Sequence, residues 1–196
     1  MKYLVVGLGN PGKEYEGTRH NVGKMLLDHL FRTHKAEEWR EDKKLKTVSA
    51  DFSAGKDTVA LLFPLTMMNN SGKAVGPVIK SKKDLERLVV VHDDLDLPLG
   101  RVKISYGRGS GGHRGLDSIM RALKSRDFVR VRIGISSATP SGKLRKPTGE
   151  KAVIDFILGK FKPDELEKLK KEFKKIAEAI EAFVKDGRQR MMSEYN

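Results

Sequence analysis

Short apolar runs that alternate with helical periodicities constrain the fold of this chain more than any other feature. Three runs, Tyr3 to Val6, Val59 to Phe63 and Leu88 to Val91, are rich in β-branched and aliphatic residues and are followed by polar or turn residues. A fourth extends from Phe128 to Ile135. Runs of this length and composition are typical of strands buried inside a sheet. We therefore expect them to form the centre of one.

Helical patterns occupy stretches between these strands. Apolar residues recur at three- and four-residue spacing from Val22 to Leu30, behind Asn21 as the expected N-cap, and again from Leu116 to Leu123. The alternation predicts a single α/β domain over residues 1–196. Its central sheet should be twisted and mostly parallel, though mixed, with helices on both faces.

Four other segments complete the predicted topology. Thr47 to Ser53 should be an antiparallel neighbour in a hairpin. A helix over 71–79 contains Pro77, which must kink or shorten it. Residues 137–150 mix Pro, Gly, Ser and Lys, which is typical of a mobile basic loop. A long amphipathic helix is expected at about 163–186.

Composition indicates what kind of partner the protein binds and in which cellular compartment it works. Lys and Arg number 39 against 26 Asp and Glu, a net charge of +13, which favours a polyanionic partner such as nucleic acid. A lysine-rich solvated surface, as in heat-adapted proteins, is the alternative. The chain has no Cys, which excludes disulfides and thiolate chemistry. Because the first apolar run is too short for a signal peptide or a membrane span, we expect a cytoplasmic protein. We also expect it to be monomeric.

Polar residues follow the buried strands in a pattern that suggests a reaction site. Asn10 follows the first strand, Asn69 the second and Asp93 the third, while His20 precedes the first helix. The carboxyl ends of parallel strands meet at one edge of a sheet, so these side chains should gather there. A helix N-terminus favours a neutral imidazole, and a carboxylate fixes its tautomer. Such a pair can activate water for attack on an ester, with the two amides orienting substrate or stabilising an oxyanion.

Simpler interpretations of the same residues stay open. His20 could be a helix cap, Asp93 a turn former, and Asn10 a turn residue beside Pro11. No His-x-x-x-His or Glu-x-x-His spacing occurs, so we expect no metal site. Residues 7–12 match the dinucleotide fingerprint formally, but the next helix begins too late for it. A nucleotide-dependent oxidoreductase is therefore only a rival hypothesis.

A basic glycine-rich segment, residues 107–115, gives a stronger signal. It holds five glycines together with Arg108, His113 and Arg114, just before a predicted helix. Such a segment allows close backbone approach to a phosphate or ribose, although it could also be a plain flexible loop. Lys103 and Arg132 on neighbouring predicted strands would extend it into a track for a phosphate backbone.

Several motifs, taken in order, resemble the bacterial-type peptidyl-tRNA hydrolases. The similarity runs from the start of the chain through Phe161 and more loosely over 192–196. The motifs are Val-Gly-Leu-Gly-Asn-Pro-Gly with Tyr15, Thr-Arg-His-Asn-Val-Gly, Pro-Leu-Thr-Met-Met-Asn-Asn-Ser-Gly, His-Asp-Asp-Leu-Asp-Leu-Pro, Gly-Gly-His-Arg-Gly-Leu and Arg-Ile-Gly-Ile.

The resemblance implies a metal-free, cofactor-free esterase that cleaves the bond between a peptide and the terminal ribose of tRNA. Its implied partner is tRNA, not DNA or a membrane. By motif position, His20 would activate water with Asp93 as its partner. The remaining implied roles are the peptide-ester end for Asn10 and Asn69, the 3′-adenosine and peptide groove for Tyr15 and Met68, and the acceptor-stem phosphate for Lys103 and Arg132.

The sequence departs from the family pattern at three positions. Arg114 follows the glycine-segment histidine where the family usually has Asn, and Met67 replaces a usual aromatic residue. Ser105 stands where a second phosphate-binding Lys is common, so the clamp could be weaker or relocated to Lys143, Arg145 and Lys146. Family-like proteins that bind RNA without hydrolysing it form a competing class, against which the retained His20 argues.

Overall fold

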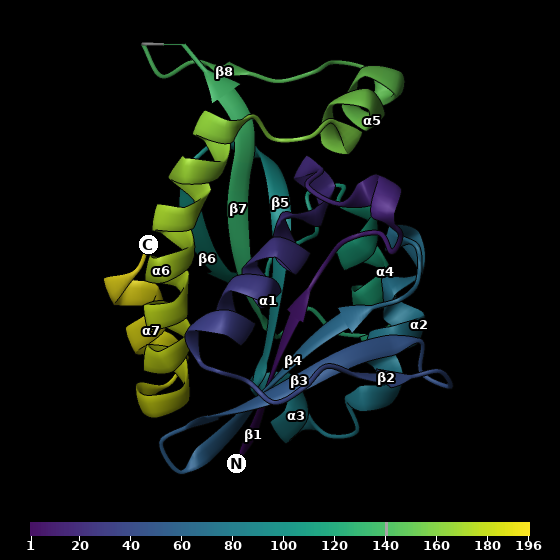
Figure 1. Cartoon of the computed structure of the whole chain (residues 1–196), viewed down its shortest axis with the longest axis vertical. Helices are drawn as coiled ribbons and strands as arrows, with labels where there is room; N and C mark the ends of the chain where they lie inside the picture. The colour runs from purple at the N-terminus through teal and green to yellow at the C-terminus, as the bar shows by residue number, and fades with distance from the viewer. Residues whose placement is uncertain (140) are drawn as a thin grey trace.

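A computed structural model describes residues 1–139 and 141–196; Pro140, in the predicted basic loop, lies outside the described residues. The chain forms a central sheet with helices on both faces (Figure 1). The strands are β1 Lys2–Gly7, β2 Arg40–Asp42, β3 Thr47–Ala54, β4 Asp57–Pro64, β5 Leu88–Pro98, β6 Val102–Tyr106, β7 Val129–Ala138 and β8 Leu144–Arg145. The helices are α1 Val22–Thr33, α2 Ser71–Val75, α3 Lys82–Glu86, α4 Arg114–Leu123, α5 Glu150–Leu158, α6 Pro163–Asp186 and α7 Arg188–Glu194. Short 3-10 turns are η1 Lys13–Tyr15, η2 Arg19–Asn21, η3 Met68–Asn70 and η4 Gly76–Val78.

The sheet has the order β2-β3-β4-β1-β5-β7-β6, with β8 paired to β7. The four central strands β4, β1, β5 and β7 are parallel, whereas β3, β6 and β8 run antiparallel to their neighbours. The prediction of a mixed, mostly parallel sheet is therefore confirmed, as is the antiparallel hairpin of β3 with β4.

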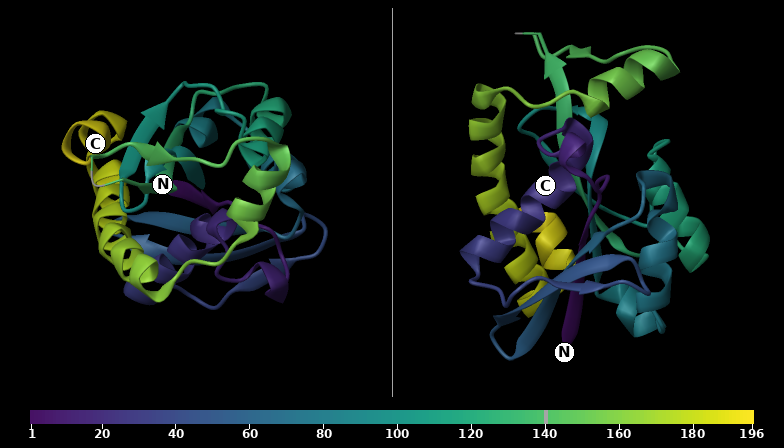
Figure 2. Two further views of the ribbon diagram at one scale, coloured as in Figure 1. Left: turned by 90° about the horizontal axis from the view of Figure 1, so that it is seen from above. Right: turned by 45° about the vertical axis from the view of Figure 1, so that its right-hand side comes forward.

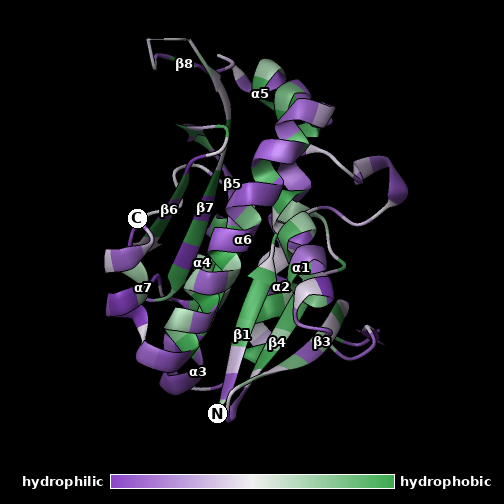
Figure 3. Cartoon of the chain, turned by 60° about the vertical axis from the view of Figure 1, so that its left-hand side comes forward, coloured by the Kyte–Doolittle hydropathy of each residue, from purple (hydrophilic) through white to green (hydrophobic). Residues whose placement is uncertain are grey.

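Alternation along the strands sends side chains into two separate cores. Val5 of β1 packs with α1 and α6 on one face, and its neighbours Leu4 and Val6 pack with α4 on the other. Figure 2 shows α1, α6 and α7 on one side of the sheet and α2, α3 and α4 on the other. Coloured by hydropathy, α6 turns its apolar stripe toward the sheet (Figure 3). None of the described helices has the length and apolar character needed to cross a membrane.

The structure corrects two local predictions. Asn21 is the N-cap residue of α1 by position, as predicted, but its side chain forms no capping hydrogen bond and binds the backbone of Asn10 instead. The region 137–150 is not simply a loop, since β7 continues to Ala138 and pairs with the short strand β8. That pairing joins residues whose own composition favours a loop, so it depends on the neighbouring strand.

Proline 77 shortens its helix as predicted. The α-helix α2 ends at Val75, and the chain continues as the 3-10 turn η4 with Pro77 in its first turn. Because proline lacks an N–H and clashes with the preceding turn, it ends regular helix at this point.

Candidate active site

Three adjacent parallel strands deliver the polar residues to one end of the sheet. Asn10 follows β1, Met68 and Asn69 follow β4, and Asp93 lies in β5, while His20 comes from η2 beside them. All five line one cleft of about 1050 Å³. The sequence-based expectation that these side chains gather at one sheet edge is met by the geometry.

Reciprocal hydrogen bonds fix the backbone at Asn10. Its N–H donates to Asn21 Oδ1 over 2.9 Å, and Asn21 Nδ2 donates to the Asn10 carbonyl over 2.9 Å. The side-chain Oδ1 of Asn10 accepts from the Met68 backbone N–H at 2.8 Å. Because that partner can only donate, the amide orientation is determined. Asn10 Nδ2 is left as a donor in the lining of the cleft.

Close packing of α1 on β1 sets the position of η2. A Cβ added to Gly23 would lie 2.5 Å from the Leu8 nitrogen and 2.6 Å from the Val91 carbonyl oxygen. Only glycine permits such a close approach. On the other side, Arg19 forms a bidentate ion pair with Glu165 of α6, with N–O distances of 2.9 to 3.1 Å. The segment that carries His20 is therefore held at both ends.

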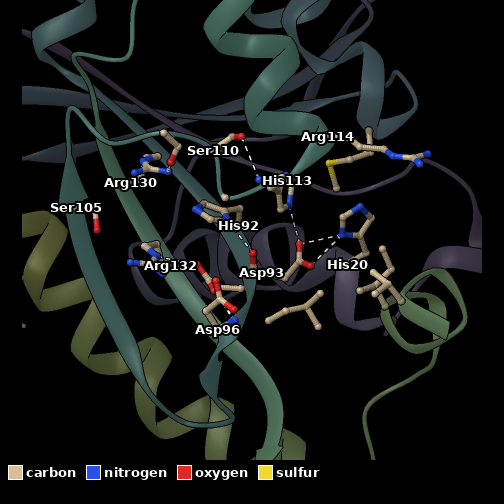
Figure 4. A pocket seen from close by; sticks show the side chains of 18 of the residues that line it. His20, His92, Asp93, Asp96, Ser105, Ser110, His113, Arg114, Arg130 and Arg132 are labelled. Atoms are coloured by element: carbon tan, nitrogen blue, oxygen red, sulfur yellow. Dashed lines mark hydrogen bonds and ion pairs between the residues drawn. The ribbon is translucent and has the colours of Figure 1, made fainter. Parts of the chain in front are cut away.

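The Asp93 carboxylate lies between two imidazoles (Figure 4). His20 Nδ1 is 2.9 Å from Asp93 Oδ1 and 3.0 Å from Oδ2, and His113 Nε2 is 2.9 Å from Oδ1. The backbone N–H of Leu116 donates to His113 Nδ1 over 3.3 Å, so His113 both caps α4 and carries its proton on Nε2. His20 donates from Nδ1 in the same way, and its Nε2 is left as a basic nitrogen.

Burial and charge act in opposite directions on Asp93. Burial raises the pKa of its carboxyl group, but the electrostatic interactions and hydrogen bonds with the imidazoles of His20 and His113 outweigh burial, and the pKa lies well below its ordinary value. Asp93 is therefore an anion across the neutral pH range. An anionic acceptor is what keeps the proton of His20 on Nδ1.

A third histidine, His92, contacts both Asp93 and His113. His92 Nδ1 lies 2.7 Å from the Asp93 carbonyl oxygen, and its ring packs edge-on against His113 with centroids 4.9 Å apart. Burial is the main cause that lowers the pKa of His92 well below its ordinary value. His92 is therefore neutral, and its buried Nε2 has no partner among the described residues.

His20, Asp93 and His113 are also the one set of His, Cys, Asp or Glu side chains, among the residues described, whose spacing could hold a metal ion. Binding would require His113 Nε2 to lose its proton. The proton would then move to Nδ1, where it would face the N–H of Leu116. The hydrogen bonds therefore fit three protein groups bound to one another better than they fit a metal.

The other half of the cleft is basic and contains its own counter-ions. Lys103 of β6 and Arg132 of β7 are opposite each other in register. Arg132 Nε donates to Asp94 Oδ2 over 2.7 Å, and Lys146 donates to Asp96 over 2.7 Å. The two predicted cations, Lys103 and Arg132, therefore lie beside each other. Two carboxylates of β5, Asp94 and Asp96, already form ion pairs in this part of the cleft.

Helix α5 forms an apolar wall over the cleft. Its residues Ile154 and Leu158 are exposed and line the cleft, and so does the exposed Met67, which precedes η3. Arg114 at the start of α4 forms an ion pair with Glu150 at the start of α5, at 2.5 Å. The side chains are 62% and 75% exposed, so the contact spans the mouth of the cleft without filling it.

A model of the family described as peptidyl-tRNA hydrolase matches residues 4–196. The chain belongs to the peptidyl-tRNA hydrolase family. A relative of that name from Syntrophomonas wolfei is 42% identical over 194 residues, which cover 98% of this chain and 99% of the relative. One from Listeria monocytogenes is 37% identical with 98% of each chain covered. The crystal structure of peptidyl-tRNA hydrolase from Acinetobacter baumannii has a TM-score of 0.86 at 31% identity, and covers 99% of this chain and 94% of its own.

Most of the residues singled out in the sequence lie in the cleft of this family member. One does not: Tyr15, in η1, is half-buried and lies outside the cleft lining. His113, predicted to contact substrate or RNA, lines the cleft and also contacts Asp93 from its place at the start of α4. Its side chain is only 8% exposed.

Sequence reasoning missed Arg130, Asp94 and Glu150. The two-residue spacing of Arg130 and Arg132 on a predicted strand was a usable signal, since it puts both side chains on one face. The pairing of Asp94 with Arg132 had no such signal. It depends on β5 and β7 being neighbours, although β6 and α4 separate them in sequence.

Proposed function

We propose that this chain hydrolyses the ester bond between the peptide and the 3′ ribose of peptidyl-tRNA, with His20 as the general base. The single observation that carries the proposal is the pairing of His20 Nδ1 with the buried Asp93 carboxylate at 2.9 Å. This pairing leaves Nε2 of His20 unprotonated in the lining of the cleft. Membership of the peptidyl-tRNA hydrolase family supports the same substrate.

In the proposed reaction, His20 Nε2 takes a proton from water as the water oxygen attacks the ester carbonyl carbon. Asp93 stabilises the imidazolium that forms. The tetrahedral intermediate then expels the ribose 3′ oxygen, which receives the proton back from His20 Nε2. The products are a peptide with a free carboxylate and a tRNA with a free 3′ hydroxyl.

The neighbouring polar groups suit supporting roles. Asn10 Nδ2 is the free donor that could stabilise the oxyanion, since its Oδ1 is occupied by Met68 N–H. Asn69 is exposed in the cleft lining and is suited to orient the peptide. His113 is a positioning residue, because it shares Asp93 Oδ1 with His20 and its other nitrogen is bound to the backbone of α4.

The basic half of the cleft is where we place the tRNA. Lys103 and Arg132 present cations beside each other, and Lys146 approaches from the β8 side. Phosphate contacts of this kind position RNA without reading its sequence. Under this proposal the protein acts where translation supplies its substrate, in the cytoplasm.

The direct test is release of peptide from an N-blocked aminoacyl-tRNA. We expect His20→Ala to lower turnover by roughly 10²-fold or more while tRNA affinity stays nearly the same. His29→Ala, on α1 outside the cleft, is the matched control and should turn over like wild type. Equal turnover by wild type and His20→Ala would remove His20 from the mechanism.

A labelling experiment separates the proposed attack from other routes. In water enriched in oxygen-18, attack at the ester carbonyl puts one labelled oxygen into the peptide carboxylate and none into the tRNA 3′ hydroxyl. Label in the tRNA would contradict the mechanism. Tight tRNA binding with no release of peptide would instead favour the competing class of RNA-binding proteins without hydrolytic activity.

A further inference from the structure

The sheet ends at β6, which is the last strand in the order of the described strands. In an antiparallel pair, alternate residues direct their backbone N–H and C=O groups toward the partner strand, and the residues between them direct theirs outward. Ile104, in the middle of β6, is one of the outward residues, because its N–H donates to the side chain of Asn196 and not to β7. The outer edge of β6 is therefore bound by a side chain where an inner strand would be bound by a neighbouring strand.

Asn196 joins β6 to helix α7 through both ends of its side-chain amide. Its Oδ1 accepts from the Ile104 backbone N–H over 2.7 Å, and its Nδ2 donates to the Met192 carbonyl oxygen over 2.9 Å. The first partner can only donate and the second can only accept, so the orientation of the amide is determined. With these two bonds the amide does for β6 what a peptide group of a neighbouring strand would do.

Helix α7 contacts β6 at a second point. The guanidinium carbon of Arg188, at the start of α7, lies 3.5 Å from the ring centroid of Tyr106, the last residue of β6, in a cation–π contact. Between the two contacts, Met191 is fully buried in the same core cluster as Ile104. Figure 3 shows α7 and the C-terminus beside β6. Residues 188–196, which we call the C-terminal segment, therefore cover the outer edge of β6.

The strand that the C-terminal segment covers forms part of the basic half of the cleft. Lys103 and Ser105 come directly before and after Ile104 and line the cleft, and Met192 and Asn196 line it too. Because Lys103 is joined by one peptide bond to the residue that Asn196 binds, the hydrogen bond of Asn196 also restrains the backbone from which that lysine extends. The C-terminal segment thus fixes the position of a cation without contributing the cation itself.

We propose that Asn196 is a positioning residue, which holds the edge strand β6, and with it Lys103, in place for the RNA part of the substrate. The proposal rests on the proposed function, which places RNA at Lys103. The hydrogen bonds of the Asn196 side chain go to β6 and α7, whereas His20 and Asp93 belong to η2 and β5. Loss of Asn196 should therefore weaken the use of a whole tRNA substrate and leave the chemistry at the ester unchanged.

Two substrates separate these effects. One is an N-blocked aminoacyl-tRNA, and the other is the same blocked amino acid esterified to adenosine, which has no acceptor-stem phosphates. Asn196→Ala should raise KM for the tRNA substrate by about fivefold, the effect of one lost hydrogen bond between neutral groups. Its kcat should stay within about twofold of wild type, because only binding is affected. For the adenosine ester, kcat/KM should equal that of wild type.

A matched control and a direct measurement of the contact complete the experiment. Gln189→Ala changes an exposed residue of the same helix and should match wild type with both substrates. Hydrogen exchange at the Ile104 amide, followed by NMR, reports on the hydrogen bond itself. The amide should exchange about fivefold faster in Asn196→Ala than in Gln189→Ala.

Several results would overturn the positioning role. An unchanged KM for the tRNA substrate in Asn196→Ala, even with a lower melting temperature, would mean that Asn196 only stabilises the fold. An equal loss with both substrates would mean that it acts at the ester. Self-association of the variant in analytical ultracentrifugation, with a wild-type KM, would assign the C-terminal segment to shielding an edge strand.

Failure of the proposed function would look different. In that case the wild-type protein would release peptide from neither substrate. The affinity of Asn196→Ala and Gln189→Ala for deacylated tRNA, measured by fluorescence anisotropy, would then test the positioning role alone. Binding about fivefold weaker in Asn196→Ala would support it, and equal binding by the two variants would overturn it.

Discussion

Replacing Asp93 by Asn tests how much of the proposed chemistry depends on one buried charge. The carboxylate accepts from His20 Nδ1 and from His113 Nε2, each at 2.9 Å. An amide of the same shape keeps one acceptor oxygen but loses the charge. It also puts an NH₂ group where Oδ2 now lies, 3.0 Å from His20 Nδ1.

The expected loss follows from Coulomb's law. A carboxylate and an imidazolium whose charge centres are about 4 Å apart interact by about 4 kcal/mol at an effective dielectric constant of 20. Because the imidazolium forms only in the transition state, the variant loses this attraction there and not in the ground state. Turnover should therefore fall by roughly 10³-fold. The NH₂ group would in addition favour the His20 tautomer with its proton on Nε2, which cannot act as a base.

The assay is single-turnover release of peptide from N-blocked aminoacyl-tRNA at saturating enzyme. A tRNA-binding measurement is run in parallel. Asp93→Asn should bind tRNA like wild type, because Asp93 is buried behind two histidines. The matched control is Asp28→Asn, on α1 outside the cleft lining. A fall in turnover of less than about tenfold, in protein of unchanged circular dichroism, would refute the electrostatic argument.

Three further predictions concern stability and access. Arg19→Ala leaves Glu165 without its partner and should lower the free energy of unfolding by about 3 kcal/mol in urea titrations; a loss below about 1 kcal/mol would contradict this. Because the pKa of His92 is lowered in the folded protein, stability should be lost as pH falls below about 6.5, and His92→Gln should flatten that dependence in unfolding curves. Glu150→Gln releases Arg114 at the cleft mouth, so it should strengthen tRNA binding while changing stability by less than about 1 kcal/mol; weaker binding would refute it.

Local periodicity was enough to predict the central strands and the helices α1, α4 and α6. Each of these elements carries its own pattern, whether a short apolar run or an apolar stripe at helical spacing. The position of Asp93 beside His20 also followed, since β1 and β5 are parallel neighbours and their ends must meet. Asp93 lies inside β5, just beyond the part of that strand that pairs with β1, so the order and direction of the strands place it.

The remaining features depend on contacts that no short window of sequence contains. The residues of β8 have a composition that favours a loop. They form a strand because β7 provides their hydrogen-bond partners. Asparagine is a residue type that often caps helices, but the side-chain amide of Asn21 forms its hydrogen bonds with the Asn10 backbone and not with the backbone of α1. The role of His113 depends on the direction in which α4 starts, and the start of α4 packs against η3 and α2, which are distant in sequence.

The carboxylates of β5 have a consequence for release of the spent RNA. Asp94 and Asp96 hold Arg132 and Lys146 at 2.7 Å. A phosphate that binds these cations must displace anions tethered to the same fold, which return at high effective concentration whenever it leaves. We expect this internal competition to limit the affinity for every tRNA alike, so that the tRNA product of the proposed reaction dissociates quickly and leaves the cleft open for the next substrate.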